Sequence, residues 1–130
     1  MTERGVIRNA RFAQQLRDFS GLRFERGITP TDIDIFMEFG NKLYIICELK
    51  FGEVKVQGGQ RMALERLADT VGETKECVLI FAKHNTPPES PIDAGNCEVV
   101  EYRWKRKWHP QREPITVRAL IDKVKTCFPI

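Results

Sequence analysis

Two apolar segments on either side of Gly40 and Asn41 constrain the fold of this chain most strongly. Asp32–Phe39 is rich in Ile, Phe and Met, and Lys42–Lys50 contains the apolar run Leu43–Cys47. A two-residue connection made of glycine and asparagine favours a tight turn between antiparallel strands. The sequence therefore predicts a β-hairpin made of these two segments.

Hydrophobic periodicity predicts the remaining elements. Helices are expected over Val6–Phe19, Gln60–Val71 and Thr116–Cys127, and further strands over Leu22–Glu25, Cys77–Ala82 and Glu98–Trp108. Glycine- and proline-bearing segments between them are expected to be loops, at Gly27–Pro30, Gly52–Gly59 and Asn85–Gly95. This order indicates an α/β or α+β domain with a mixed central β-sheet flanked by helices. With 130 residues and no visible linker or repeat, we expect a single domain over Met1–Ile130.

The composition and the cysteine pattern are typical of a globular protein of the cytoplasm. Hydrophobic residues make up 42% and charged residues 30% of the chain. No apolar run approaches the roughly 20 residues of a membrane span, so no membrane partner is expected. Met1–Arg11 has no apolar core resembling a signal peptide. Cys47, Cys77, Cys97 and Cys127 form no metal-binding spacing, and we expect reduced, structural thiols.

Charged residues interrupt the second hairpin strand where its pattern predicts burial. Glu48 directly follows Leu43–Cys47, and Lys50 lies on the same face because side chains alternate along a strand. A carboxylate in such a position is costly unless an opposite charge or a metal compensates it. Folding the hairpin brings Asp34 beside Glu48, since both are about equally far from the turn. The sequence thus predicts a Mg²⁺ site at one end of the sheet, and surface ion pairs at a strand end are the alternative.

These motifs resemble those of the PD-(D/E)XK, or restriction-endonuclease-like, nuclease superfamily. The resemblance rests on Thr31–Asp34, on Ile46–Lys50 (ICELK) and on Gly59-Gln60-Arg61 at the start of the next helix. It covers about half the chain, and the small size is similar to that of members found in phages. The resemblance implies a restriction-endonuclease-like core. It also implies a site with Mg²⁺, or Mn²⁺, as cofactor.

The resemblance also implies roles for individual residues. Asp34 and Glu48 would be the metal ligands, and the backbone carbonyl of Leu49 would be a further ligand. Lys50 would be the catalytic lysine, and Gln60 would position the site.

Two departures from the family pattern concern the metal ligands. Many members place a glutamate on the first helix, where this chain offers Gln14, Gln15 and Asp18, with Glu25 as a substitute from the next segment. The proline–aspartate pair is also absent, because Thr31 separates Pro30 from Asp32. Asp32 and Asp34 therefore compete for the ligand role, and the spacing from the turn favours Asp34.

By this resemblance the chain is expected to be a metal-dependent nuclease that hydrolyses phosphodiester bonds in DNA. Two alternatives remain open. One is a catalytically inactive nuclease fold that binds DNA or a protein, because a shared fold does not guarantee a shared activity. The other is a subunit of an RNA-processing complex. Small members of the family work as homodimers or as subunits of larger complexes.

Basic residues cluster in the segment Tyr102–His109 (YRWKRKWH). The net charge of +3 is mild, so this distribution is more informative than the total. Trp104 and Trp108 are four residues apart and are expected to share a face, where they either pack in the core or stack on nucleobases. Candidate phosphate contacts, which a solvated surface explains almost as well, are Lys55, Arg61, Arg103, Lys105, Arg106 and Lys107.

Overall fold

The predicted hairpin forms, with Gly40, Asn41 and Lys42 between its strands where the sequence predicts a two-residue connection. Strand β1 (Ile35–Phe39) pairs antiparallel with strand β2 (Leu43–Phe51). Gly40 and Asn41 have φ angles of 58° and 57°, which a type I′ turn requires at both central positions. Asparagine and glycine tolerate these angles better than other residues do, so the dipeptide itself specifies the turn.

The computed structural model describes residues 15–128. The chain divides into two compact units, Met1–Thr31 and Asp32–Ile130. The second unit holds every strand and both α-helices that the structure describes. One domain over the whole chain stays a prediction.

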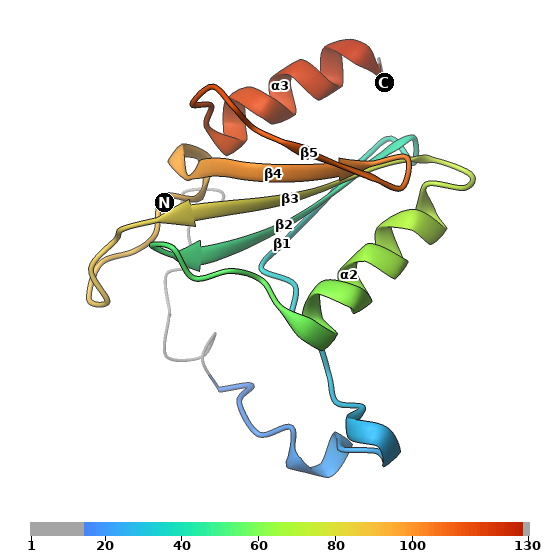
Figure 1. Cartoon of the computed structure of the whole chain (residues 1–130), viewed down its shortest axis with the longest axis vertical. Helices are drawn as coiled ribbons and strands as arrows, with labels where there is room; N and C mark the ends of the chain where they lie inside the picture. Colours follow the sequence, from blue (N-terminus) through green and yellow to red (C-terminus); the bar gives the residue numbers. More distant parts are fainter. Residues whose placement is uncertain (1–14, 129–130) are drawn as a thin grey trace, which may run out of the picture. The chain divides into compact units, whose positions relative to one another are not determined.

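The second unit is built on a five-stranded mixed sheet in the order β1-β2-β3-β4-β5 (Figure 1). Helix α2 (Gly58–Val71) connects β2 to the parallel strand β3 (Glu76–His84). Strands β4 (Glu98–Trp104) and β5 (Lys107–Pro110) continue the sheet with antiparallel pairing. A short 3₁₀ turn, η3 (Ala94–Asn96), lies in the loop before β4. The predicted mixed sheet flanked by helices is confirmed.

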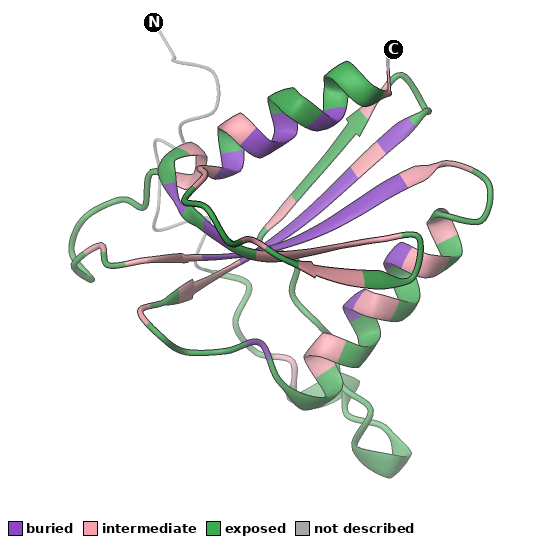
Figure 2. Cartoon of the chain, turned by 45° about the horizontal axis from the view of Figure 1, so that its top comes forward, coloured by how far each residue is buried: buried purple, intermediate pink, exposed green. Residues whose placement is uncertain are grey.

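Alternation along the strands gives the sheet two apolar faces. One face packs against α3 (Val117–Cys127), and the other packs against α2. The buried positions of both helices point toward the sheet in Figure 2. Thr116 begins α3 by accepting a hydrogen bond from the Ala119 N–H at 3.1 Å, the side-chain cap that Thr provides at a helix start. The central strands β2 and β3 are covered on both sides, which explains their nearly continuous apolar runs.

The single strand predicted over Glu98–Trp108 is wrong. Lys105 and Arg106 adopt φ angles of 50° and 67°, and the chain reverses there into the β4–β5 hairpin. Trp104 therefore packs on the α3 face, whereas Trp108 packs on the α2 face. The expectation that the two tryptophans share a face is also wrong, because the turn between them breaks the alternation. Both pack against core clusters.

In the unit Met1–Thr31, the described residues form two 3₁₀ turns, η1 (Ser20–Leu22) and η2 (Glu25–Gly27). The helix predicted over Val6–Phe19 is wrong for residues 15–19, which are not helical. Residues 6–14, which include Gln14, lie outside the described residues. Asp18 accepts hydrogen bonds from the backbone N–H and hydroxyl of Ser20 at 3.0 and 2.7 Å, which competes with helix formation.

The strand predicted over Leu22–Glu25 is wrong as well. Arg26 and Gly27, which follow it, have φ angles of 64° and 75°. The N–H of Phe24 donates to the Ile28 carbonyl across this turn at 2.7 Å. The local hydrogen bond closes a loop in place of a strand pairing.

All four cysteines are free thiols, and three of them have the burial expected of structural residues. Cys47, Cys77 and Cys97 are buried, whereas Cys127 is exposed. Burial raises the pKa of Cys47 and of Cys77 to about 12, so these two thiols are unreactive at neutral pH. Within residues 15–128, no helix is both long and apolar enough to span a bilayer.

Candidate active site

Among the described residues, Glu48 is the carboxylate that is buried, with 3% of its surface exposed. It lies near the end of β2 on the face covered by α2, two residues after the buried Ile46. Its Oε1 accepts a hydrogen bond from Nε2 of Gln60 at 3.1 Å. Its Oε2 is buried and has no hydrogen-bond partner within the described residues. Such an oxygen is costly to bury and is available to a ligand.

The electrostatic surroundings of Glu48 favour its neutral form. Burial, followed by the neighbouring carboxylate of Asp34, raises the pKa of Glu48 to about 7, although the Lys50 ammonium acts in the opposite direction. Two neighbouring carboxyl groups of this kind form a site that a cation would stabilise.

Asp34 directly precedes β1 and is the partner of Glu48 in this site. Its Oδ2 accepts a hydrogen bond from the backbone N–H of Leu49 at 2.8 Å. The N–H and C=O of one strand residue project to the same side, so the Leu49 carbonyl also faces the Asp34 edge of β2. Asp32 and Asp34 are both exposed, but the structure shows no such contact for Asp32 in the described part of the chain. Of the two competing aspartates, the fold brings Asp34 to Glu48.

Lys50 lies on the same face of β2 as Glu48, as its spacing predicts. It is partly buried, and its positive charge opposes the rise in the pKa of Glu48 without cancelling it. Among the ion pairs of residues 15–128, none involves Lys50. The structure thus brings Asp34, Glu48, Leu49, Lys50 and Gln60 together at the carboxyl end of β2.

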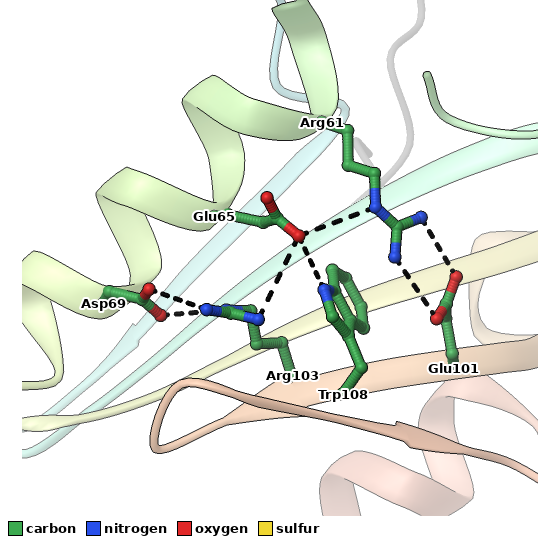
Figure 3. A network of polar contacts seen from close by, with 6 residues as sticks. All are labelled: Arg61, Glu65, Asp69, Glu101, Arg103 and Trp108. Carbon is green, nitrogen blue, oxygen red and sulfur yellow. Dashed lines mark hydrogen bonds and ion pairs between the residues drawn. The ribbon is translucent and has the colours of Figure 1, made fainter. Parts of the chain in front are cut away.

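Gln60 belongs to the first turn of α2, and a network of ion pairs holds this helix against the β4–β5 hairpin (Figure 3). Arg61 pairs with Glu101 at 3.2 Å and with Glu65 at 3.5 Å. Arg103 forms two hydrogen bonds of 2.9 Å with Asp69. These contacts lower the pKa of Asp69 and raise that of Arg103. The network fixes the position from which Gln60 reaches Glu48.

Aromatic rings support the same network. The Arg61 guanidinium lies 4.4 Å from the centroid of the Trp108 ring and 5.3 Å from that of Phe81. The indole N–H of Trp108 donates to Glu65 at 2.6 Å. No motif in the sequence predicts this network. Its one local signal is the four-residue spacing of Arg61, Glu65 and Asp69, which places them along one side of α2.

The predicted phosphate-contacting residues have different surroundings. Arg61 and Arg103 bind carboxylates of the same chain, and Arg106 pairs with Glu73 at 3.0 Å. Nζ of Lys105 lies 4.7 Å from the centroid of the Trp104 ring. Lys55 and Lys107 are exposed. Contact of these six residues with a nucleic acid stays a prediction.

The candidate metal site consists of side-chain and backbone oxygen atoms, and all of them belong to the unit Asp32–Ile130. Within the described residues, no group of three or more His, Cys, Asp or Glu side chains is placed to hold a metal ion. A metal at Glu48 would therefore bind two carboxylates and the carbonyl of Leu49, which are the hard ligands that Mg²⁺ prefers. The unpartnered Oε2 of Glu48 fits this donor set. Gln15, Asp18 and Glu25 belong to the other unit.

Comparison with known proteins does not assign the chain to a family. No family model, no curated protein and no solved structure matches it.

Proposed function

We propose that the chain is a metal-dependent nuclease with a restriction-endonuclease-like core, acting on phosphodiester bonds in DNA. The observation that carries the proposal is the buried Glu48, whose Oε2 has no partner among the described residues although Asp34 and Lys50 are its neighbours. A buried acid in this state destabilises the fold unless it serves a ligand. A divalent cation shared by Glu48 and Asp34 would neutralise both carboxylates.

The residues present fit Mg²⁺ or Mn²⁺. Asp34, Glu48 and the Leu49 carbonyl would hold the ion. When bound, such an ion supplies charge neutralisation and Lewis acidity at a phosphodiester. Gln60 fixes the orientation of the Glu48 carboxylate through its 3.1 Å hydrogen bond. This arrangement leaves Oε2 free to bind the ion.

Lys50 has a separate role in the proposal. Its ammonium shares the face of Glu48 and forms no ion pair within residues 15–128. A fixed positive charge at this position stabilises negative charge that develops on the phosphate oxygens and orients an attacking water. The order of hairpin, α2 and parallel β3 around these residues supports a restriction-endonuclease-like core.

The test is cleavage of labelled linear duplex, branched and single-stranded DNA, and of RNA, with Mg²⁺, with Mn²⁺ and with EDTA. We expect metal-dependent cleavage of DNA by the wild type and none by Glu48→Gln. Glu89→Gln, which changes an exposed loop acid, is the matched control and should cleave as the wild type does. Cleavage that persists in EDTA, or in Glu48→Gln, would contradict the proposal.

A second candidate is a catalytically inactive module of the same fold. The small number of acidic ligands in the described residues favours it, since two carboxylates bind Mg²⁺ weakly without further oxygen donors. DNA binding without cleavage on every substrate, in either metal, would select this candidate.

A further inference from the structure

Two lysines lie side by side at the carboxyl end of the parallel strands. Lys50 of β2 is in register with Lys83 of β3. Glu48 and Phe81, two residues earlier, are in register as well, and Phe81 packs on the α2 face. Because side chains alternate, Lys50 and Lys83 both project to that face. Like charges directly opposite each other are unfavourable in a sheet unless an anion compensates them.

The partners of Lys83 compensate this repulsion only weakly. Its Nζ lies 3.3 Å from Glu53 and 3.8 Å from Glu98. The side chain of Glu53 is 90% exposed and that of Glu98 is 54% exposed. Ion pairs this exposed contribute at most about 1 kcal/mol each and are readily exchanged for another anion. Lys83 itself is 32% exposed and is therefore accessible from solution.

The surroundings of Lys83 leave space for an anion. A cavity of about 420 Å³ lies beside Lys83 and is also bordered by His84, Asn85 and the acids Asp93 and Glu98, whereas Lys50 and Glu48 do not line it. Neighbouring strands are separated by roughly 4.8 Å, so the flexible side chains of Lys50 and Lys83 start close enough to reach different oxygens of one phosphodiester.

We propose that Lys83 is a substrate-binding residue, which together with Lys50 binds a backbone phosphate of the nucleic acid beside Glu48. The inference rests on the proposed nuclease function and adds a subsite to it. In the absence of substrate, Glu53 and Glu98 form ion pairs with the ammonium group of Lys83. The phosphate displaces them on binding, so these two acids lower the affinity for nucleic acid.

The test measures binding separately from cleavage. Fluorescence anisotropy of a fluorescein-labelled DNA duplex is recorded with Ca²⁺ in place of Mg²⁺ over a series of KCl concentrations. Lys83→Gln should weaken binding roughly three- to tenfold and reduce the slope of log Kd against log salt by about one. Lys83→Arg should retain both the affinity of the wild type and its slope of log Kd against log salt. Lys42→Gln, in the turn that precedes β2, is the matched control and should behave as the wild type does.

Glu53→Gln provides a test in the opposite direction. Removing the competing acid should strengthen binding, and this gain should disappear when Lys83→Gln is added. A purely structural lysine predicts the reverse, with a loss of stability in Glu53→Gln and no change in Kd. Equal Kd values for Lys83→Gln and Lys42→Gln, with a wild type that binds DNA, would overturn the inference alone. A wild type that neither binds nor cleaves DNA would overturn the proposed function, and the inference with it.

Discussion

Nε2 of Gln60 donates a hydrogen bond to Oε1 of Glu48 at 3.1 Å, and this bond joins the first turn of α2 to the buried end of β2. It satisfies one oxygen of Glu48 and leaves the other without a partner in the described residues. The ion pairs of Arg61 fix the helix from which Gln60 projects. The geometry of the candidate site therefore depends on contacts that lie outside it.

Replacing Gln60 by Ala should weaken metal binding. Without the hydrogen bond, the Glu48 carboxylate is free to rotate, and loss of such a supporting contact typically reduces metal affinity by roughly 10- to 100-fold. Isothermal titration calorimetry with Mn²⁺ measures the effect. Gln57→Ala is the control, because Gln57 forms no side-chain cap at the start of α2. Equal affinities in the two variants would remove Gln60 from the site.

Exchange of each aspartate for asparagine decides which one binds the metal. Asp34→Asn should abolish most Mn²⁺ binding, whereas Asp32→Asn should leave the affinity unchanged. The asparagine carbonyl at position 34 still accepts the Leu49 N–H, so the end of the hairpin is preserved. Calorimetry at one protein concentration compares the two variants. A larger loss in Asp32→Asn would reverse the assignment.

Lys50→Ala should abolish cleavage and leave the fold intact. Removing one preorganised charge from an active site lowers turnover by roughly 10²–10³-fold. Because Lys50 forms no ion pair within residues 15–128, the melting temperature and the Mn²⁺ affinity should change little. Cleavage rate, Tm and calorimetry are measured on the same preparation. Retained cleavage with a small loss of Tm would make Lys50 an ordinary surface residue.

The stability of the metal-free protein should fall as the pH rises through the pKa of Glu48. In the folded state this pKa is about 7, above its ordinary value of 4.5, so the folded state binds the proton more tightly. The resulting stabilisation is complete below about pH 4.5 and is lost by about pH 7. Urea unfolding in EDTA at about pH 5 and about pH 8 measures it against Glu48→Gln. The expectation would be contradicted if, between about pH 5 and about pH 8, the unfolding free energy of the wild type did not fall relative to that of Glu48→Gln.

Arg61→Ala should destabilise the protein by about 1–2 kcal/mol, because it removes two ion pairs and a cation–π contact with Trp108. Arg66→Ala changes an exposed arginine of the same helix and should stay within about 0.5 kcal/mol of the wild type. Chemical denaturation gives both values. If the two variants lose equal stability, the network does not hold α2 on the sheet.

Local sequence signals were sufficient for the part of the fold that carries the site. Gly40 and Asn41 specify their turn through their own backbone preferences, and the alternation of strand residues places Glu48 and Lys50 on one face. The helix predicted over Gln60–Val71 is confirmed, with its start two residues earlier at Gly58. Its apolar positions recur at helical spacing, which is a property of neighbouring residues alone.

Long-range contacts decided the features of the fold and of the site that local sequence signals did not predict. The turn at Lys105 and Arg106 has no glycine or proline to mark it, and it places Trp104 and Trp108 on opposite faces. The spacing from the turn only favours Asp34 over Asp32, and the tertiary structure adds the hydrogen bond from the Leu49 N–H to Asp34. The sequence determined which charged residues lie near the strand end. The tertiary structure decided which of them are buried and paired, because burial and hydrogen-bond partners come from segments distant in the chain.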